Sequence, residues 1–340
     1  MEQNHPRRPA WRRWFDRYLI DAMSYMALGL FSSLIIGLII SQLSMIPFLA
    51  FLAPFASVID ASSPVVGGAI GAAVATGLGA RSLVVFSAIA AGAFGYQAGG
   101  PVGAYIGAVF GAEAGRLVAG KTKVDIVVTP MVTIVAGCVV AGLTGPAIQG
   151  FMEGLGQAVM SATVMSPLPM GILVSVIVGM ALTAPISSAA LCIMLQLDGL
   201  AAGAAVVGCC AQMVGFAVAS YRDNGLGGLI SQGIGTSMLQ FGNIMRRPQI
   251  WIAPTLASAV LGPVSTCLLQ MTNTPTGAGM GTSGLVGQFG AIASMGASPT
   301  VLAEIVVMHV LAPAILTLLF DWVLRKLGWV RAGDMALQKI

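Results

Sequence analysis

Positions 272–288 of this 340-residue chain read Thr-Asn-Thr-Pro-Thr-Gly-Ala-Gly-Met-Gly-Thr-Ser-Gly-Leu-Val-Gly-Gln, inside a run without charged side chains from 248 to 303. A lipid-facing helix does not tolerate so many glycines, because each costs about 1 kcal/mol against alanine and exposed amides in hydrocarbon cost several more. Irregular backbone at membrane depth is tolerated where protein buries it or where it lines a water-filled cavity. The segment therefore predicts a sheltered hairpin that binds or passes a solute.

The composition is that of an integral membrane protein. Hydrophobic residues make up 57% of the chain and charged residues 8%, against about 25% charged in ordinary soluble proteins. Little sequence lies outside the apolar runs, which leaves no room for a sizeable soluble domain. The five cysteines lie in apolar runs without metal-ligand spacing, and the two histidines form no zinc or triad pattern. We therefore expect no cofactor, no metal and no nucleic-acid partner.

Apolar runs of spanning length predict an all-α polytopic membrane protein of about ten transmembrane helices. The predicted crossings are 19–40, 64–79, 82–99, 101–118, 125–143, 169–197, 199–219, 225–245, 250–271 and 299–324. Positions 45–60 are short and hold two prolines, which predicts a re-entrant element. Positions 145–162 carry Gln149, Glu153 and Gln157 at helical spacing, which predicts an amphipathic helix on the outer surface. The lipid bilayer is thus the chain's solvent over most of its length.

Charge distribution predicts the orientation and the domain limits. Five arginines with interleaved aromatic residues predict that 1–18 is a basic amphipathic segment at the membrane surface. The apolar runs predict one transmembrane domain at 19–324, followed by a tail at 325–340. With ten crossings, every basic residue except Arg222 falls on the side of the N-terminus. The positive-inside rule then predicts that both termini are cytoplasmic.

Glycines recur at every fourth position from Gly95 to Gly115. This spacing makes a smooth stripe on a helix, which favours close backbone packing, with a narrow passage lined by backbone as the alternative. A faint echo between 126–146 and 250–263, each with an Ile-x-x-x-Pro and a Gly-Pro, indicates a possible internal repeat.

Polar groups inside apolar runs are the candidate functional residues, because a charge near the bilayer centre costs at least a few kcal/mol. Glu304 and His309 lie on the last span, where each is either functional or an interfacial or core residue. A break is predicted at 183–188, Thr-Ala-Pro-Ile-Ser-Ser, because Pro185 removes a helix hydrogen bond and two serines suit a new helix start. Such a break is either a binding site or a structural kink.

The strings Arg-Arg-Pro-Gln-Ile-Trp-Ile-Ala-Pro at 246–254 and Asn-Thr-Pro-Thr-Gly at 273–277, continuing to Gln288, with the 183–188 string upstream, resemble the EIIC-type membrane domain of the phosphotransferase system, in its PfoR-like group. The resemblance covers nearly the whole chain. It implies a homodimeric permease with re-entrant hairpins in the bacterial cytoplasmic (inner) membrane, served by separate phosphotransferase components. It also implies a sugar site with a histidine and a glutamate, for which Glu304 and His309 are the counterparts available here.

We therefore predict a transporter rather than an enzyme, one that moves a small polar solute, such as a sugar or organic anion, by alternating access. The solute is expected between the 272–288 segment and the Pro185 break. The expected ligands are Asn273, Thr274, Thr276, Gln288, Thr183, Ser187 and Ser188, with Glu304 or His309 tuning charge or carrying a proton. A membrane sensor that binds without transport, and a channel, are the alternatives.

Overall fold

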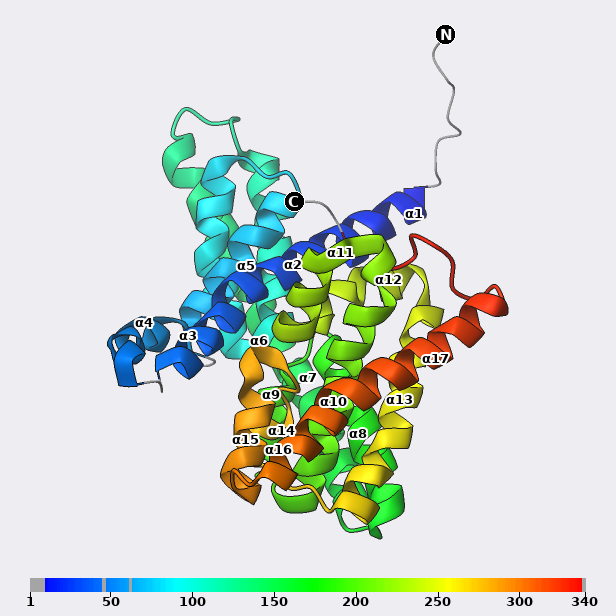
Figure 1. The fold of residues 1–340 in the computed structure, drawn as a ribbon. Coiled ribbons are helices and arrows are strands. Elements are labelled where there is room, and N and C mark those ends of the chain that lie inside the picture. The colour runs from blue at the N-terminus through cyan, green and yellow to red at the C-terminus, as the bar shows by residue number, and fades with distance from the viewer. Residues whose placement is uncertain (1–9, 45–46, 61–62, 338–340) are drawn as a thin grey trace.

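The computed structural model describes residues 10–44, 47–60 and 63–337, and this part of the chain is helical without any named β-strand. Parts of three predicted segments lie outside the described residues, namely 1–9, 45–46 and 338–340. The N-terminal half comprises α1 (Ala10–Phe15), α2 (Ala22–Leu30), α3 (Ile36–Ser44), α4 (Ala53–Ala56), α5 (Pro64–Gly77), α6 (Ser82–Val118) and α7 (Asp125–Thr163). The C-terminal half comprises α8 (Pro167–Thr183), α9 (Ser188–Met194), α10 (Gly199–Ala219), α11 (Tyr221–Ile230), α12 (Phe241–Arg246), α13 (Ile252–Pro263), α14 (Pro275–Ala278), α15 (Val286–Met295), α16 (Pro299–Val306) and α17 (Ala312–Lys326) (Figure 1).

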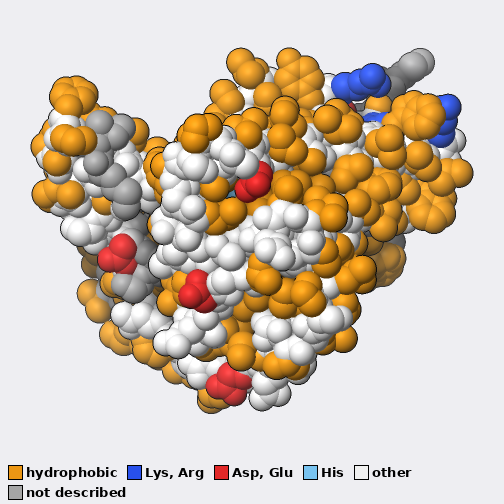
Figure 2. All heavy atoms as spheres, turned by 60° about the horizontal axis from the view of Figure 1, so that its bottom comes forward, with side chains coloured by type: hydrophobic (Ala, Val, Ile, Leu, Met, Phe, Trp, Pro, Cys, Tyr) orange, Lys and Arg blue, Asp and Glu red, His pale blue; other side chains and the backbone are white. Residues whose placement is uncertain are grey.

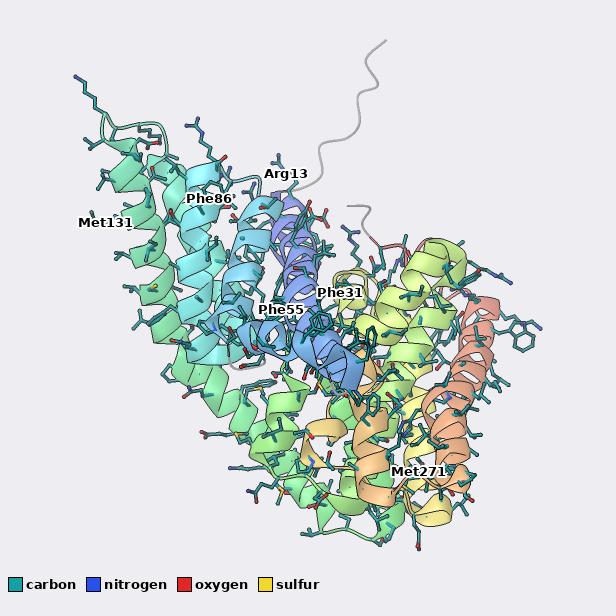
Figure 3. All side chains as sticks on the ribbon, turned by 60° about the vertical axis from the view of Figure 1, so that its left-hand side comes forward. Arg13, Phe31, Phe55, Phe86, Met131 and Met271 are labelled. Carbon is teal, nitrogen blue, oxygen red and sulfur yellow. The ribbon has the colours of Figure 1, made fainter. Side chains whose placement is uncertain are left out.

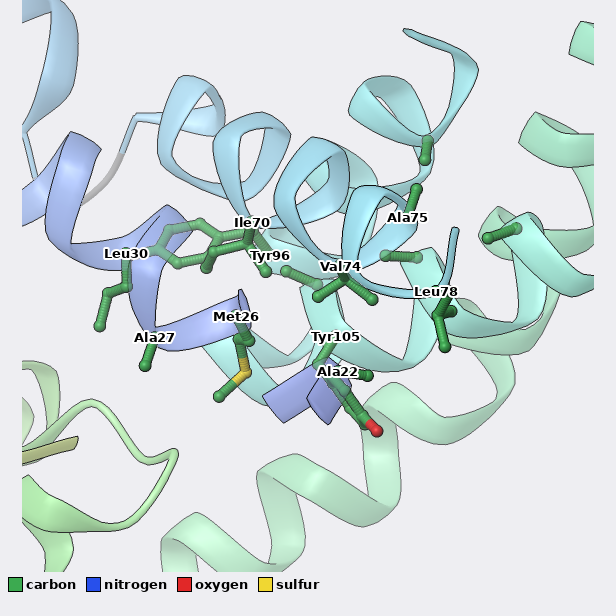
Figure 4. Packing of buried hydrophobic residues seen from close by; sticks show 14 of the residues in the cluster. Ala22, Met26, Ala27, Leu30, Ile70, Val74, Ala75, Leu78, Tyr96 and Tyr105 are labelled. Atoms are coloured by element: carbon green, nitrogen blue, oxygen red, sulfur yellow. The ribbon is translucent and has the colours of Figure 1, made fainter. Parts of the chain in front are cut away.

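Helices α2, α5 and α6 form the first packed body. Their buried side chains meet in one cluster that includes Met26, Ile70, Val74, Tyr96 and Tyr105, as Figure 4 shows. Many of the intervening residues are alanine and glycine, so the helix backbones lie close together. The outward faces carry large apolar side chains instead, which suits contact with lipid.

Helix α6 folds back on itself. Gly99 and Gly100 have non-helical backbone angles, and Gly100 has a φ of 60°. A Cβ atom on Gly95 would lie 2.2 Å from the carbonyl oxygen of Gly103, so the two halves run antiparallel in direct backbone contact. The predicted boundary between 82–99 and 101–118 and the packing role of the glycine stripe are both confirmed. At about 1.5 Å per residue, each half is about 25 Å long, close to the thickness of the hydrocarbon core.

Helix α7 is one continuous helix rather than the predicted crossing 125–143 followed by a separate surface helix 145–162. Pro146 lies inside it without ending it. Its first half packs against α6, where Gly137 approaches the carbonyl of Gly107, and its second half contacts the end of α9, where Gly156 approaches Leu191 and the following Leu195. Figure 3 shows α7 running from one group of helices to the other, with Met131 on its outer side. It therefore connects the two bodies of the protein.

The second body is built around α10, which lies almost entirely inside the protein. A Cβ atom on Gly203 would lie 1.9 Å from the carbonyl oxygen of Met271, and one on Gly208 would lie 2.0 Å from that of Ser175. Helices α8 and α13 and the segment that follows α13 therefore pack directly on the α10 backbone. Helix α17 covers a third side, where Thr317 approaches Gly215.

Two predicted crossings are corrected. The expected span 225–245 is a broken segment in which α11, a π-helical turn (η5, Ser231–Gly235), a 3-10 turn (η6, Ser237–Gln240) and α12 follow one another at one end of the body. Gly225, with a φ of 61°, interrupts α11. The expected span 169–197 ends at Thr183, as the Pro185 break predicts, and resumes only as the short α9.

Six helices of the described residues are long and apolar enough to cross a membrane, or up to seven if the bent pair Pro47–Ile59 and Pro64–Gly77 counts as one span. This supports a polytopic membrane protein with bent helices, whereas the count of about ten is not confirmed. The count treats α6 as a single helix although its halves are antiparallel. Apolar side chains cover much of the face seen in Figure 2, with a few Asp and Glu side chains among them and Lys and Arg side chains gathered at one edge.

Ion pairs and hydrogen bonds join the charged ends of distant helices at one end of the molecule. Arg17 pairs with Glu113 at 2.7 Å and donates to the carbonyl of Leu78 at 3.1 Å, while Arg246 pairs with Asp21 at 3.5 Å. Arg222 lies at this end too, because the neighbouring Asp223 accepts from the backbone of the C-terminal segment. Its predicted place on the opposite side is therefore corrected, and the cytoplasmic orientation of this end remains a prediction from the positive-inside rule.

We expect Gly95→Ala to destabilise the protein by about 1–3 kcal/mol, because the added methyl group would overlap the backbone of Gly103. Gly154→Ala is the matched control, since nothing lies within 4 Å of its new Cβ and alanine favours a helix. Thermal unfolding in detergent should show a lower midpoint for Gly95→Ala only. Equal midpoints for the two variants would contradict the tight hairpin.

Candidate functional site

The 272–288 segment forms a re-entrant hairpin. Helix α14 leads to a turn at 280–285, and α15 returns antiparallel, so that Gly277 faces Gly290 and Gly281 faces Gly287. Thr274 caps α14 by accepting from the amide of Gly277 at 3.3 Å. The residues from Gly277 to Gly284 are all buried. Protein therefore shelters this irregular backbone, which is the condition for its stability inside a membrane.

The hairpin contacts the second broken element directly. The Ser188 hydroxyl donates to the carbonyl oxygen of Gly279 at 2.6 Å, and nearby Gly199, at the start of α10, forms an antiparallel bridge with Asn273. Ser187 caps the new helix α9 through the amide of Ala190 at 3.3 Å. The two segments singled out from the sequence thus lie side by side and are bonded to each other.

Backbone strain concentrates around these two elements. The described residues other than glycine with a positive φ are Gln196 (48°), Gln270 (49°) and Leu285 (61°). Gln196 follows α9, Gln270 precedes the hairpin, and Leu285 lies in its turn. Such conformations cost about 1–3 kcal/mol each and persist where surrounding contacts enforce them, often at functional sites.

Most hydrogen-bonding groups of the hairpin are used within it. The Asn273 side chain is fully buried, donates to the carbonyl of Gly287 at 2.9 Å and accepts from the amide of Thr274 at 2.8 Å. The hydroxyls of Thr274 and Thr276 lie 3.1 Å apart, and Thr276 is exposed. Asn273 therefore fastens the two arms of the hairpin together.

Gln288 and His309 form a pair behind the hairpin. The Nε2 atom of Gln288 lies 3.1 Å from Nδ1 of His309, whose ring is fully buried. The His309 Nε2 and Gln288 Oε1 atoms have no hydrogen-bond partner among the described residues. Glu304, five positions earlier, is partly exposed on α16. The last span thus buries the His309 ring inside the protein and leaves the Glu304 carboxylate partly exposed.

A cavity of about 970 Å³ opens between the two bodies. Its walls come from the turn of α6, the middle of α7 and the break after α8. The lining residues that carry polar or aromatic groups include Gln97, Gln149, Glu153, Ser187, Phe241 and Trp251. Ser187 is the one predicted ligand that lines this cavity, and the hairpin residues are set back from it. Glu153 is the single charged side chain among the described lining residues.

A buried polar cluster supports the cavity wall behind the break. Gln212, at the centre of the apolar helix α10, accepts from the Thr183 hydroxyl at 3.2 Å and from the Trp251 indole N–H at 3.0 Å. Its amide nitrogen donates to Thr255 at 3.2 Å, and Ser237 lies 2.8 Å from the Thr183 hydroxyl. The Thr183 hydroxyl is thus bonded within this cluster and does not line the cavity. Gln212 fixes the orientation of Trp251.

Sequence reasoning missed Gln212, Trp251 and the lining role of Gln149 and Glu153. The sequence does hold a signal for Gln212, because it is a lone side-chain amide in an otherwise apolar 21-residue helix. Uncharged polar groups at membrane depth also need hydrogen-bond partners. Gln149 and Glu153 are recognisable as a polar stripe, but the sequence alone places them on an outer surface. Nothing local to Trp251 distinguishes it from an interfacial tryptophan.

We expect Gln212→Leu to change the environment of Trp251, because the indole N–H would lose its buried acceptor. With Trp11, Trp14, Trp322 and Trp329 replaced by phenylalanine, the fluorescence of Trp251 should shift to shorter wavelength, and the free energy of unfolding should fall by about 1–3 kcal/mol. Thr255→Val removes another bond of Gln212 but leaves the indole bond intact. An emission maximum that moves equally in both variants would contradict the assigned role of Gln212.

Comparison with known proteins gives one family. A family model described as "Phosphotransferase system, EIIC" matches residues 20–337, which is nearly the whole chain and includes both broken elements and the cavity lining. No curated protein and no solved structure matches the chain significantly. The chain therefore belongs to the EIIC family of membrane components of the phosphotransferase system.

Proposed function

We propose that this permease carries a small, polar, uncharged solute through the cavity between its two bodies by alternating access. The single observation that carries the proposal is the position of the cavity, which is bounded on one side by the α6 turn and on the other by the break at Pro185. Secondary transporters commonly bind solutes where helices are discontinuous, at the interface between bundles. A relative movement of the two bodies about α7 would open the cavity to alternate sides.

The polar groups of the cavity favour a neutral solute over an organic anion. Gln97, Gln149 and Ser187 offer donors and acceptors, and Trp251 and Phe241 offer aromatic faces, whereas Glu153 would repel an anion. Neutral sugars fit this chemistry, and the family membership supports them. We assign Ser187 to direct contact, and Thr183, Ser188, Asn273 and the Gln288–His309 pair to holding the two broken elements in position.

The proposed permease is a multi-pass protein of the bacterial inner membrane with cytoplasmic termini, assembled as a homodimer. It would work with separate phosphotransferase components that act on the solute once it has crossed. Glu304, partly exposed on α16, is proposed to tune the charge near the hairpin during the movement.

We expect Ala147→Trp to reduce transport at least tenfold, because the indole would fill part of the cavity without entering a packed core. Val135→Trp, on the lipid-facing side of α7, is the matched control. Thermal-shift screening of purified protein against neutral sugars and organic acids would identify a solute, and flux into proteoliposomes would then be measured. Binding without flux in the unaltered protein would indicate a sensor, and steady single-channel current would indicate a channel; either result refutes the proposal.

We expect Glu153→Gln to improve binding of an anionic analogue of that solute by about three- to tenfold, because removing the carboxylate removes a repulsion of about 1 kcal/mol. Binding of the neutral solute should change less. Gln157→Ala, about one turn further along α7 and outside the cavity lining, serves as control. Isothermal titration with both ligands gives the comparison, and an unchanged preference would remove Glu153 from the site.

A further inference from the structure

The C-terminal segment Arg331–Leu337 is folded back onto the broken region between α10 and α13. Met335 is completely buried in an apolar cluster with Phe216, Ile244 and Ile250. Figure 1 shows the coil after α17 returning over α12 and α11. The described part of this segment is therefore packed against the rest of the protein.

Side-chain amides and one carboxylate of the broken region recognise the backbone of this segment. Asn224 donates to the carbonyl of Met335 at 2.8 Å and accepts from the amide of Leu337 at 2.7 Å, so its side chain bonds the backbone on both sides of Ala336. Asp223 accepts from the amides of Gly333 and Met335 at 3.1 and 3.3 Å.

Three further contacts hold the C-terminal segment against the broken region. Gln240 donates to the carbonyl of Met335 at 2.9 Å, and Asn243 donates to that of Ala336 at 2.9 Å. Arg247 pairs with Asp334 at 3.7 Å. Main-chain recognition of this kind depends on the path of the segment and only weakly on its side chains.

The residues that hold the C-terminal segment are directly connected to those that hold the two broken elements of the candidate site. Gln240 closes the η6 turn that begins at Ser237, and Ser237 contacts Thr183 at the end of α8. Gln240 also donates to Gln232 at 2.9 Å, and the next residue, Gly233, accepts a hydrogen bond from Thr282 in the hairpin turn. One short segment, 231–240, therefore bonds the C-terminal backbone on one side and both breaks on the other.

We infer that the C-terminal segment Arg331–Leu337 is a positioning element of the candidate site, which sets the geometry of both broken elements through residues 231–240. Its release would loosen the contacts at Thr183 and at Thr282 together. The inference goes beyond transport and concerns the coupling of two regions, so its test needs no solute and does not depend on the proposed function.

Hydrogen exchange measured by mass spectrometry on the full-length protein in detergent tests this coupling. Asn224→Leu removes both hydrogen bonds between the Asn224 side chain and the backbone of the C-terminal segment. Truncation after Leu327 removes the whole segment. Amides in 231–240, 184–190 and 280–285 should then exchange about tenfold faster, while those in the first half of α7 keep their rate. Arg331→Ala, which alters only an exposed side chain of the same segment, is the control and should match the unaltered protein.

Two results would overturn the inference. Faster exchange confined to 221–243 and the C-terminal segment would show that the contacts of this segment do not influence the two broken elements. Faster exchange in α7 to the same degree would show that the segment contributes only to global stability. Because Asn224→Leu is a single change at one partner, it separates these outcomes even if the shortened chain fails to fold.

Discussion

The need to satisfy every backbone amide away from water governs this structure. The chain breaks its helices at the Pro185 segment and at the 272–288 hairpin, and each break frees donors and acceptors inside the membrane domain. The protein satisfies them both between and within the breaks: Ser188 of one break bonds Gly279 of the other, and Asn273 closes the hairpin onto its own Gly287. The two irregular elements are thus stable as a pair, and their adjacency follows from that requirement.

The sequence predicts features whose cause is local. Pro185 lacks an amide hydrogen, so the end of α8 near it follows from covalent structure. Glycine at every fourth position can only help a helix if another backbone approaches, and the contact of Gly95 with Gly103 confirms this. The hairpin is predictable because Pro275 and five glycines between 272 and 288 exclude a lipid-facing helix.

Features that depend on packing between distant segments escape such reasoning. Gln149 and Glu153 form a polar stripe whether α7 faces water or a cavity, and only the position of the α6 turn decides which. The stretch 225–245 has the composition of a crossing, yet Gly225 adopts a positive φ and the segment bonds the C-terminal backbone instead. Trp251 acquires its role from Gln212, which lies 39 positions away.

The small residues of α10 determine which parts of the molecule can move independently. Gly203 and Gly208 bring the hairpin and α8 into backbone contact with α10, so these elements have no room to slide past it. Packed interiors transmit displacement rather than absorb it. The cavity, by contrast, separates the break after α8 from the α6 turn, and α7 spans this gap, whereas α2 contacts η6 and α3 contacts the hairpin turn of the second body. In the proposed transport movement, the two broken elements would therefore be carried along with α10 as one unit.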